Sequence, residues 1–220
     1  MASWFGSYYR CWQVFAAEWY DPSPDCHKKD VATMSDVIER VLGFWFLPPE
    51  KTDANAARKI WFMTDLEFDR EIAERFMADY KKACSGNYDD LGQSAIGSVV
   101  LVIMLDQFPR NLFRGSAQAF ATDARAREVA DRALSNGFDR ELGTWQRMFL
   151  YLPFEHSEGF ADQERSVALF TELGHAETLK YAISHRDIIQ QFGRFPTRNA
   201  ALGRINTAEE KKFLEDFSEF

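Results

Sequence analysis

The sequence predicts an all-α protein of about eight helices, stacked as helical hairpins. Apolar residues recur at helical spacing along most of the chain, capping residues open many of these segments, and no segment alternates convincingly like a strand. The 220 residues are 46% hydrophobic and 27% charged, which suits a packed core and excludes general disorder. We therefore expect a single all-helical domain over residues 34–220.

The first 33 residues differ in composition from the rest. Between Trp4 and Tyr20 they hold eight aromatic and almost no aliphatic residues, and the prolines at 22 and 24 interrupt any helix. We interpret residues 1–33 as an aromatic-rich N-terminal extension. One hypothesis is a segment that lies on a membrane or caps the core. The hypothesis we favour is an upstream start codon, with Met34 as the usual first residue.

Caps and stops define the first two helices of the domain. Ser35 or Asp36 can cap a helix that reaches about Phe46, before a pair of prolines. A capping box at residues 64–67 opens a long helix with apolar residues at steps of four, which ends near Gly86.

The third helix is expected to be the most buried one. Asp89 or Asp90 can open it, and its apolar run at residues 99–105 favours a helix that is covered on most sides. Capping signals then predict five further helices. They begin at Thr122 or Asp123, at Thr144, at Asp162, near Glu177, and at a second capping box over residues 207–210.

Charge and cysteine content narrow the class of protein. The formal net charge is −8 and no basic run is present, so we expect no nucleic-acid partner. The three cysteines form no C-x-x-C pair, which favours a reducing cytoplasm over a disulfide framework. The longest charge-free stretch, residues 91–105, is too short and too polar at its start to span a bilayer. We therefore expect no stable membrane insertion.

Three ionisable residues interrupt the apolar stripes of predicted helices: Asp106, His156 and His185. Each lies three or four residues from apolar positions, so its side chain points with them toward the core. An unpaired buried charge costs several kcal/mol, so each of the three needs a partner. Asp106 also lies near a predicted helix C-terminus, where the helix dipole disfavours negative charge. A nearby arginine would relieve both problems.

Two similar proline segments, residues 107–111 and 193–199, supply arginines. In each, the proline is expected to hold the preceding phenylalanine in an extended conformation, so that arginine and asparagine turn back across the helix end. One interpretation is architectural, with Arg110 and Arg194 clamping Asp106 or the helix carbonyls. The other is a binding module whose inner polar cleft holds an anionic small molecule or peptide. The candidate ligand-binding residues are Asp106, Arg110, Asn111, His156, Glu158, His185, Asp187, Arg194, Arg198 and Asn199.

An enzyme is the alternative hypothesis. His156 or His185 would act as a general base, oriented by Asp106, Glu158 or Asp187, while an arginine stabilises a developing anion. The chain has no nucleophile elbow, phosphate-binding loop or dinucleotide motif. We therefore expect a binding protein rather than an enzyme, and no cofactor. Imidazole and carboxylate groups suit zinc, manganese or iron. We nevertheless expect no metal, because His156 and Glu158 are two residues apart and would face different sides of a helix.

Several motifs carry a resemblance to a known family. They are residues 41–46, 105–111, 153–158, 161–166, 185–199 and 202–204. In this order they resemble the bacterial domain of unknown function 924 family, from Ser35 to Phe217. The resemblance implies an all-helical fold similar to tetratricopeptide-repeat superhelices, and it implies no established reaction. The family motifs coincide with the polar residues singled out above, which supports one shared site.

Overall fold

The structure is a computed structural model that describes residues 27–46 and 59–216, with side chains from residue 34 onward. The chain divides into a unit of residues 1–36 and a unit of residues 37–220. The hypotheses about the extension at residues 1–33 rest on its aromatic residues, which lie outside the described residues.

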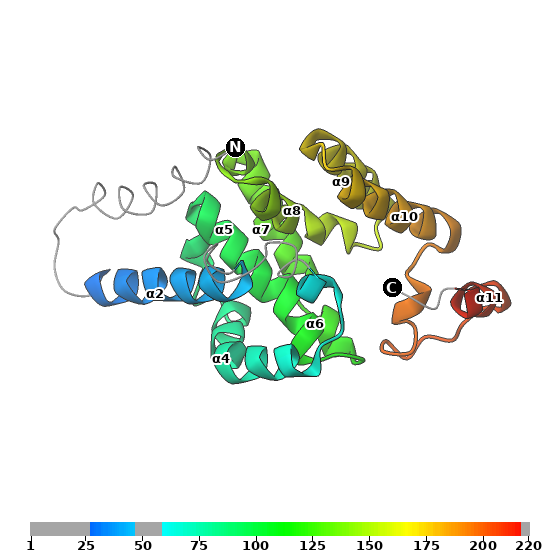
Figure 1. The fold of residues 1–220 in the computed structure, drawn as a ribbon, viewed down its shortest axis with the longest axis horizontal. Coiled ribbons are helices and arrows are strands. Elements are labelled where there is room, and N and C mark those ends of the chain that lie inside the picture. Colours follow the sequence, from blue (N-terminus) through cyan, green and yellow to red (C-terminus); the bar gives the residue numbers. More distant parts are fainter. Residues whose placement is uncertain (1–26, 47–58, 217–220) are drawn as a thin grey trace. The chain divides into compact units, whose positions relative to one another are not determined.

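The described residues form nine α-helices and no strand (Figure 1), so the all-α prediction is confirmed. The helices are α2 (His27–Trp45), α4 (Leu66–Cys84), α5 (Ala95–Val102), α6 (Phe108–Leu112), α7 (Asp123–Ser135), α8 (Thr144–Glu155), α9 (Phe160–Leu173), α10 (Ala176–Phe192) and α11 (Ala208–Asp216). Short single-turn elements lie between them: η1 (Asp89–Gln93), η2 (Ile103–Gln107), η3 (Ala117–Phe120), η4 (Phe138–Glu141) and η5 (Pro196–Arg198). All of these are 3₁₀ turns except η2, which is a π-helical turn.

The later helix starts agree with the sequence. α7, α8 and α10 begin within one residue of the expected positions. The second capping box also forms as expected. The Thr207 hydroxyl accepts a hydrogen bond from the Glu210 amide at 3.1 Å, and the Glu210 carboxylate accepts one from the Thr207 amide at 2.7 Å.

Other helix starts differ from the prediction. α2 begins at His27, eight residues before Ser35. Asp65, not Thr64, caps α4, because its carboxylate accepts hydrogen bonds from the amides of residues 67 and 68. The acidic pair at residues 89 and 90 opens only η1, and Ser94 caps α5 instead. α9 begins at Phe160, which places Asp162 inside its first turn, where the helix dipole still favours a carboxylate.

α5 and η2 form the centre of the core. Every residue from Val99 to Leu105 is buried, as the apolar run predicted. Within the described chain, Ala95–Leu112 is the one stretch long and apolar enough to cross a membrane, but 78% of it is buried inside the protein. Around it, the Trp45 ring meets Phe108 and Phe149 edge-on, with ring centroids 5.7 and 5.5 Å apart. These large rings account for much of the apolar burial.

The second half of the chain is a run of neighbouring helices. α8 packs against both α7 and α9, and α9 packs against α10 (Figure 1). Gly193 ends α10 with a φ of 69°, a left-handed conformation that glycine adopts without steric cost. The chain then turns through η5 to α11, and these two elements pack against each other.

Candidate functional site

The site begins at η2, where the core helix widens into a π-helical turn. The Phe108 amide donates to the Ile103 carbonyl, five residues back. Pro109 has no amide hydrogen and its ring would crowd the Leu105 carbonyl in a regular helix. The π turn relieves this conflict, and the freed Leu105 carbonyl accepts a hydrogen bond from the Thr122 hydroxyl at 2.5 Å. The helix therefore continues past the proline.

The two proline segments differ in conformation. Phe108 is helical, with φ −55° and ψ −41°, so the prediction that it would be extended is wrong. The cause is the π turn, which accommodates the proline without ending the helix. Phe195 is extended, with φ −86° and ψ 109°, and is buried, so the same prediction is confirmed there.

Asp106 is completely buried in the π turn and has three side-chain partners. His156 Nδ1 lies 2.8 Å from Oδ2, Gln107 Nε2 donates to Oδ2 at 2.6 Å, and Arg110 Nη1 lies 3.4 Å from Oδ1. The expected arginine partner is therefore present. Burial raises the pKa of Asp106, but the charge of Arg110 and the interactions with His156 and Gln107 outweigh it and hold that pKa below its usual range. Asp106 is thus a carboxylate.

The Asp106 carboxylate fixes the tautomer of His156. Because a carboxylate only accepts hydrogen bonds, the proton of a neutral His156 ring lies on Nδ1, and Nε2 carries the lone pair. Burial and the positive charge of Arg110 lower the pKa of His156, against the opposing pull of Asp106. At neutral pH the ring is therefore an uncharged base held in one orientation.

Two arginines share the carboxylate of Asp123, at the start of α7. Arg110 donates to both of its oxygens, at 2.9 and 3.1 Å, while Arg198 lies 3.4 Å from one of them. The Arg198 guanidinium carbon lies 4.6 Å from the ring centroids of both Phe120 and Phe195. Burial, and then the like charge of Arg110, lower the pKa of Arg198 to about 10. The guanidinium groups of Arg110 and Arg198 are thus held close together by the single carboxylate of Asp123.

A second acid lies near Asp106 and stays protonated. Glu155 is buried, and its Oε1 lies 3.4 Å from Nδ1 of His185, which also donates to the Tyr181 carbonyl at 2.9 Å. Burial and the negative charge of Asp106 raise the pKa of Glu155 to about 8. Burial lowers the pKa of His185, as do the more distant charges of Arg198 and Arg110.

We call this set of side chains the polar cluster. Its members are Asp106, Arg110, Asp123, Glu155, His156, His185 and Arg198. Their accessibilities divide by charge type. The four basic side chains keep 13 to 22% of their surface exposed, whereas the three acidic ones keep 0 to 10%. The acids therefore lie deeper, and solvent reaches mainly the basic groups.

The structure brings five of the ten predicted ligand-binding residues into this cluster. They are Asp106, Arg110, His156, His185 and Arg198. Two further members, Asp123 and Glu155, were not among the predicted binding residues. Asp123 was predicted only as a helix cap, and Glu155, three residues after Leu152, has an inward spacing that the sequence analysis did not use. Long-range pairing put both beside the arginines and the histidine, and no local pattern records that pairing.

The remaining predicted residues have other partners. Arg194 forks onto Glu210 at 2.6 and 2.9 Å, so it does not clamp Asp106. Asn199 is buried and donates to Asn206 at 2.7 Å. Both contacts lie within residues 194–216, because the turn at η5 brings α11 back against η5.

Two more predicted residues lie on other surfaces. Asn111 donates to Asp69 on α4 at 2.8 Å. Asp187 is exposed on α10 and accepts a hydrogen bond from Arg186 at 2.7 Å. The helical periodicity explains Asp187, since it lies two residues beyond His185 and so faces a different side of α10.

Glu158 lies at the edge of the cluster without joining it. It accepts two hydrogen bonds from Arg204, both of 2.8 Å, and one from the Phe195 amide at 2.9 Å. Its charge nevertheless acts on Arg198, which follows Phe195 by three residues. The three donors hold the pKa of Glu158 below its usual range despite partial burial.

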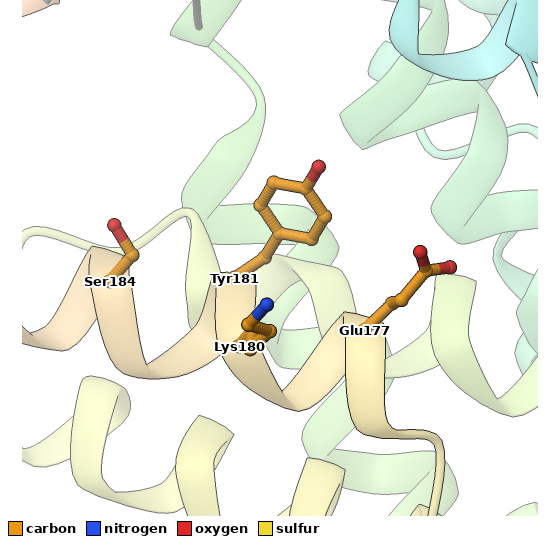
Figure 2. A pocket seen from close by; sticks show the side chains of 4 residues that line it. All are labelled: Glu177, Lys180, Tyr181 and Ser184. Carbon is orange, nitrogen blue, oxygen red and sulfur yellow. The ribbon is translucent and has the colours of Figure 1, made fainter.

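A surface cleft of about 280 Å³ lies elsewhere, along one face of α10. Figure 2 shows the four side chains that line it, Glu177, Lys180, Tyr181 and Ser184, which follow helical spacing. None of the predicted ligand-binding residues lines this cleft. Across residues 27–46 and 59–216, no group of three or more histidine, cysteine, aspartate or glutamate side chains is placed to hold a metal ion.

The fold and the cluster define a class: an all-α protein whose central helix carries a buried aspartate, histidine and arginine at a π turn. The chain belongs to the family described as bacterial proteins of unknown function (DUF924), whose profile matches residues 41–217. A solved structure of a protein of unknown function, ATU0120 from Agrobacterium tumefaciens, is 39% identical, with a TM-score of 0.74. The match covers 84% of this chain and 98% of that one. No curated protein matches the chain.

Proposed function

We propose that the chain is a binding protein whose polar cluster holds a small oxyanion, namely a carboxylate or phosphate group on a small molecule or peptide. The observation that supports this most directly is the state of Arg198. Among the described residues, its guanidinium has a single hydrogen-bond partner, Asp123, at 3.4 Å. Arg110, in contrast, already uses its fork on the same carboxylate.

An oxyanion would satisfy Arg198 in two ways. It would accept the fork of donors that Asp123 engages only weakly. It would also offset the repulsion between Arg198 and Arg110, which now lowers the pKa of Arg198. The rings of Phe120 and Phe195 hold the guanidinium plane, so little side-chain entropy is lost on binding.

The charges of the cluster cancel at neutral pH, but their arrangement favours an anionic ligand. At neutral pH, Asp106 and Asp123 balance Arg110 and Arg198, while Glu155 is protonated. The acids lie deepest, so an approaching ligand meets the basic side chains first. A cationic ligand would have to pass the two guanidinium groups to reach any carboxylate.

Isothermal titration calorimetry with sodium acetate and inorganic phosphate tests the proposal. We expect Arg198→Lys to weaken binding of whichever anion binds the wild type, because an ammonium group cannot reproduce a stacked fork. The matched control is Arg165→Lys. Arg165 also stacks on a phenyl ring, that of Phe154 at 4.4 Å, and pairs with Asp131 at 2.6 Å, outside the cluster. Equal anion binding by wild type and Arg198→Lys would refute the proposal.

A second candidate function is general-base catalysis, and the Asp106–His156 pair favours it. A carboxylate that fixes Nδ1 and leaves Nε2 as the base is the arrangement that acid–base enzymes use. The neutral state of His156 would let it accept a proton from a bound substrate at neutral pH. His156→Gln would then abolish turnover of the native ligand while leaving its binding nearly intact. A ligand recovered unchanged from the host protein, as seen by native mass spectrometry, would argue for binding alone.

We further propose a cytoplasmic location and a tetratricopeptide-like superhelix. The odd number of cysteines supports a reducing compartment. The successive packing of α8, α9 and α10 supports a stack of helical hairpins.

A further inference from the structure

Arg198 of the polar cluster and one of the two rings on which it stacks come from a late part of the chain. Phe195 and Arg198 belong to the segment that follows α10, residues 194–216. The rest of the cluster comes from η2, α6, α7, α8 and α10. Whether Arg198 reaches the cluster therefore depends on how this segment is attached to the earlier helices.

The C-terminal segment is largely closed on itself. Arg194, at its start, forks onto Glu210 in α11, and Asn199 pairs with Asn206 across the turn between them. α11 packs against η5 within the same segment (Figure 1). These internal contacts hold the segment together as a unit, but they do not join it to the helices that bear the cluster.

Glu158 supplies a direct attachment from the other side. It lies in the connection between α8 and α9, and it binds the segment at two places, the Phe195 amide and both terminal nitrogens of Arg204. The three distances are 2.9, 2.8 and 2.8 Å, and the carboxylate is about three-quarters covered. Forked arginine–carboxylate pairs of this kind are directional as well as strong.

We propose that Glu158 is a positioning residue for the oxyanion site. It fastens residues 194–216 to the connection between α8 and α9, and it thereby holds Arg198 over Phe120 and against Asp123. This inference rests on the proposed oxyanion-binding function. Glu158 acts beside a second attachment, since the ring of Phe195 also meets that of His185 edge-on, with centroids 5.5 Å apart.

The proposal and simple electrostatics predict opposite effects of Glu158→Gln on anion affinity. Glu158 is a negative charge close enough to Arg198 to act on its pKa. If this charge were its whole contribution, Glu158→Gln would remove a repulsion and tighten anion binding. If Glu158 positions the segment, the same change weakens anion binding, because Arg198 then occupies its place in the cluster for a smaller fraction of the time.

The test combines hydrogen exchange with phosphate titration on the full chain. In Glu158→Gln we expect faster amide exchange over residues 195–204 than in the wild type, with α9 unchanged. We expect the affinity for inorganic phosphate to fall about tenfold, equivalent to about 1.4 kcal/mol. Arg204→Gln breaks the same pair from the other side and should behave alike, and the double variant should be no worse than either single one. Glu164→Gln, on an exposed position of α9, is the matched control.

Each other outcome overturns the inference in a distinct way. Unchanged exchange over residues 195–204 would mean that Glu158 does not fasten the segment. Faster exchange with equal or tighter phosphate binding would mean that the oxyanion site exists but that Glu158 does not position it. Absence of binding by the wild type, for phosphate and acetate alike, would refute the proposed function itself, and the positioning role with it.

Discussion

Glutamine in place of Glu155 should remove a large part of the pH dependence of this protein's stability. Glu155 lies beside His185, and its burial together with the charge of Asp106 keeps its carboxyl group protonated. A neutral glutamine has nearly the same shape as a protonated glutamate. We therefore expect Glu155→Gln to fold normally and to resemble the wild type at mildly acidic pH.

The magnitude follows from the pKa values in the two states. The pKa of Glu155 is about 8 in the folded chain, against the ordinary value of 4.5 for a glutamate side chain. Between these values the folded state keeps a proton that the unfolded state releases. The stabilisation is therefore complete below pH 4.5 and is lost as pH rises through 8. Each pH unit is worth up to about 1.4 kcal/mol, so the wild type should lose about 3 kcal/mol relative to Glu155→Gln between pH 5.5 and 7.5.

Urea unfolding followed by tryptophan fluorescence, at pH 5.5, 6.5, 7.5 and 8.5, measures this difference. Subtracting the variant from the wild type cancels the titration of the histidines, which both proteins share. Glu164→Gln should track the wild type at every pH. A wild-type minus Glu155→Gln difference that stays constant from pH 5.5 to 8.5 would show that Glu155 ionises normally, and our account of the cluster's charge would fail.

Three further substitutions test the polar cluster and its helix. Arg110→Lys should lower the free energy of unfolding by about 2–4 kcal/mol, because a point charge cannot serve Asp106 and the forked Asp123 together; an unchanged urea midpoint would contradict this. Asp106→Asn should cost about 3–5 kcal/mol at pH 7, and less as pH falls, since the lowered pKa of Asp106 gives stability that is lost on acidification; equal losses at pH 7 and pH 3 would count against it. Thr122→Val should cost about 1–2 kcal/mol by leaving the Leu105 carbonyl without its hydroxyl donor, and a calorimetric melting point equal to that of the wild type would exclude this role.

At the π turn, a local sequence rule predicted the wrong backbone conformation. The rule for residues before proline predicted an extended Phe108, and the same rule was correct for Phe195. The difference comes from the surroundings. Residues 103–108 are buried on all sides and Thr122 is available to bind the freed Leu105 carbonyl, so the helix widens and continues. At Phe195 a glycine has already ended α10, so nothing opposes the extended conformation.

The amino-acid sequence alone determined the helical class, the starts of α7, α8, α10 and α11, and the inward direction of Asp106, His156 and His185. These features depend on residue spacing, capping groups and the cost of burying a charge, all of which act within a few positions of the chain. The choice of partners was decided only by the tertiary structure. Asp123 received both arginines, Glu155 lay close enough to Asp106 to remain protonated, and Glu158 turned to the C-terminal segment. Each of these pairings joins residues that are distant in the sequence, and Coulomb energy depends on their distance in space, which no local pattern encodes.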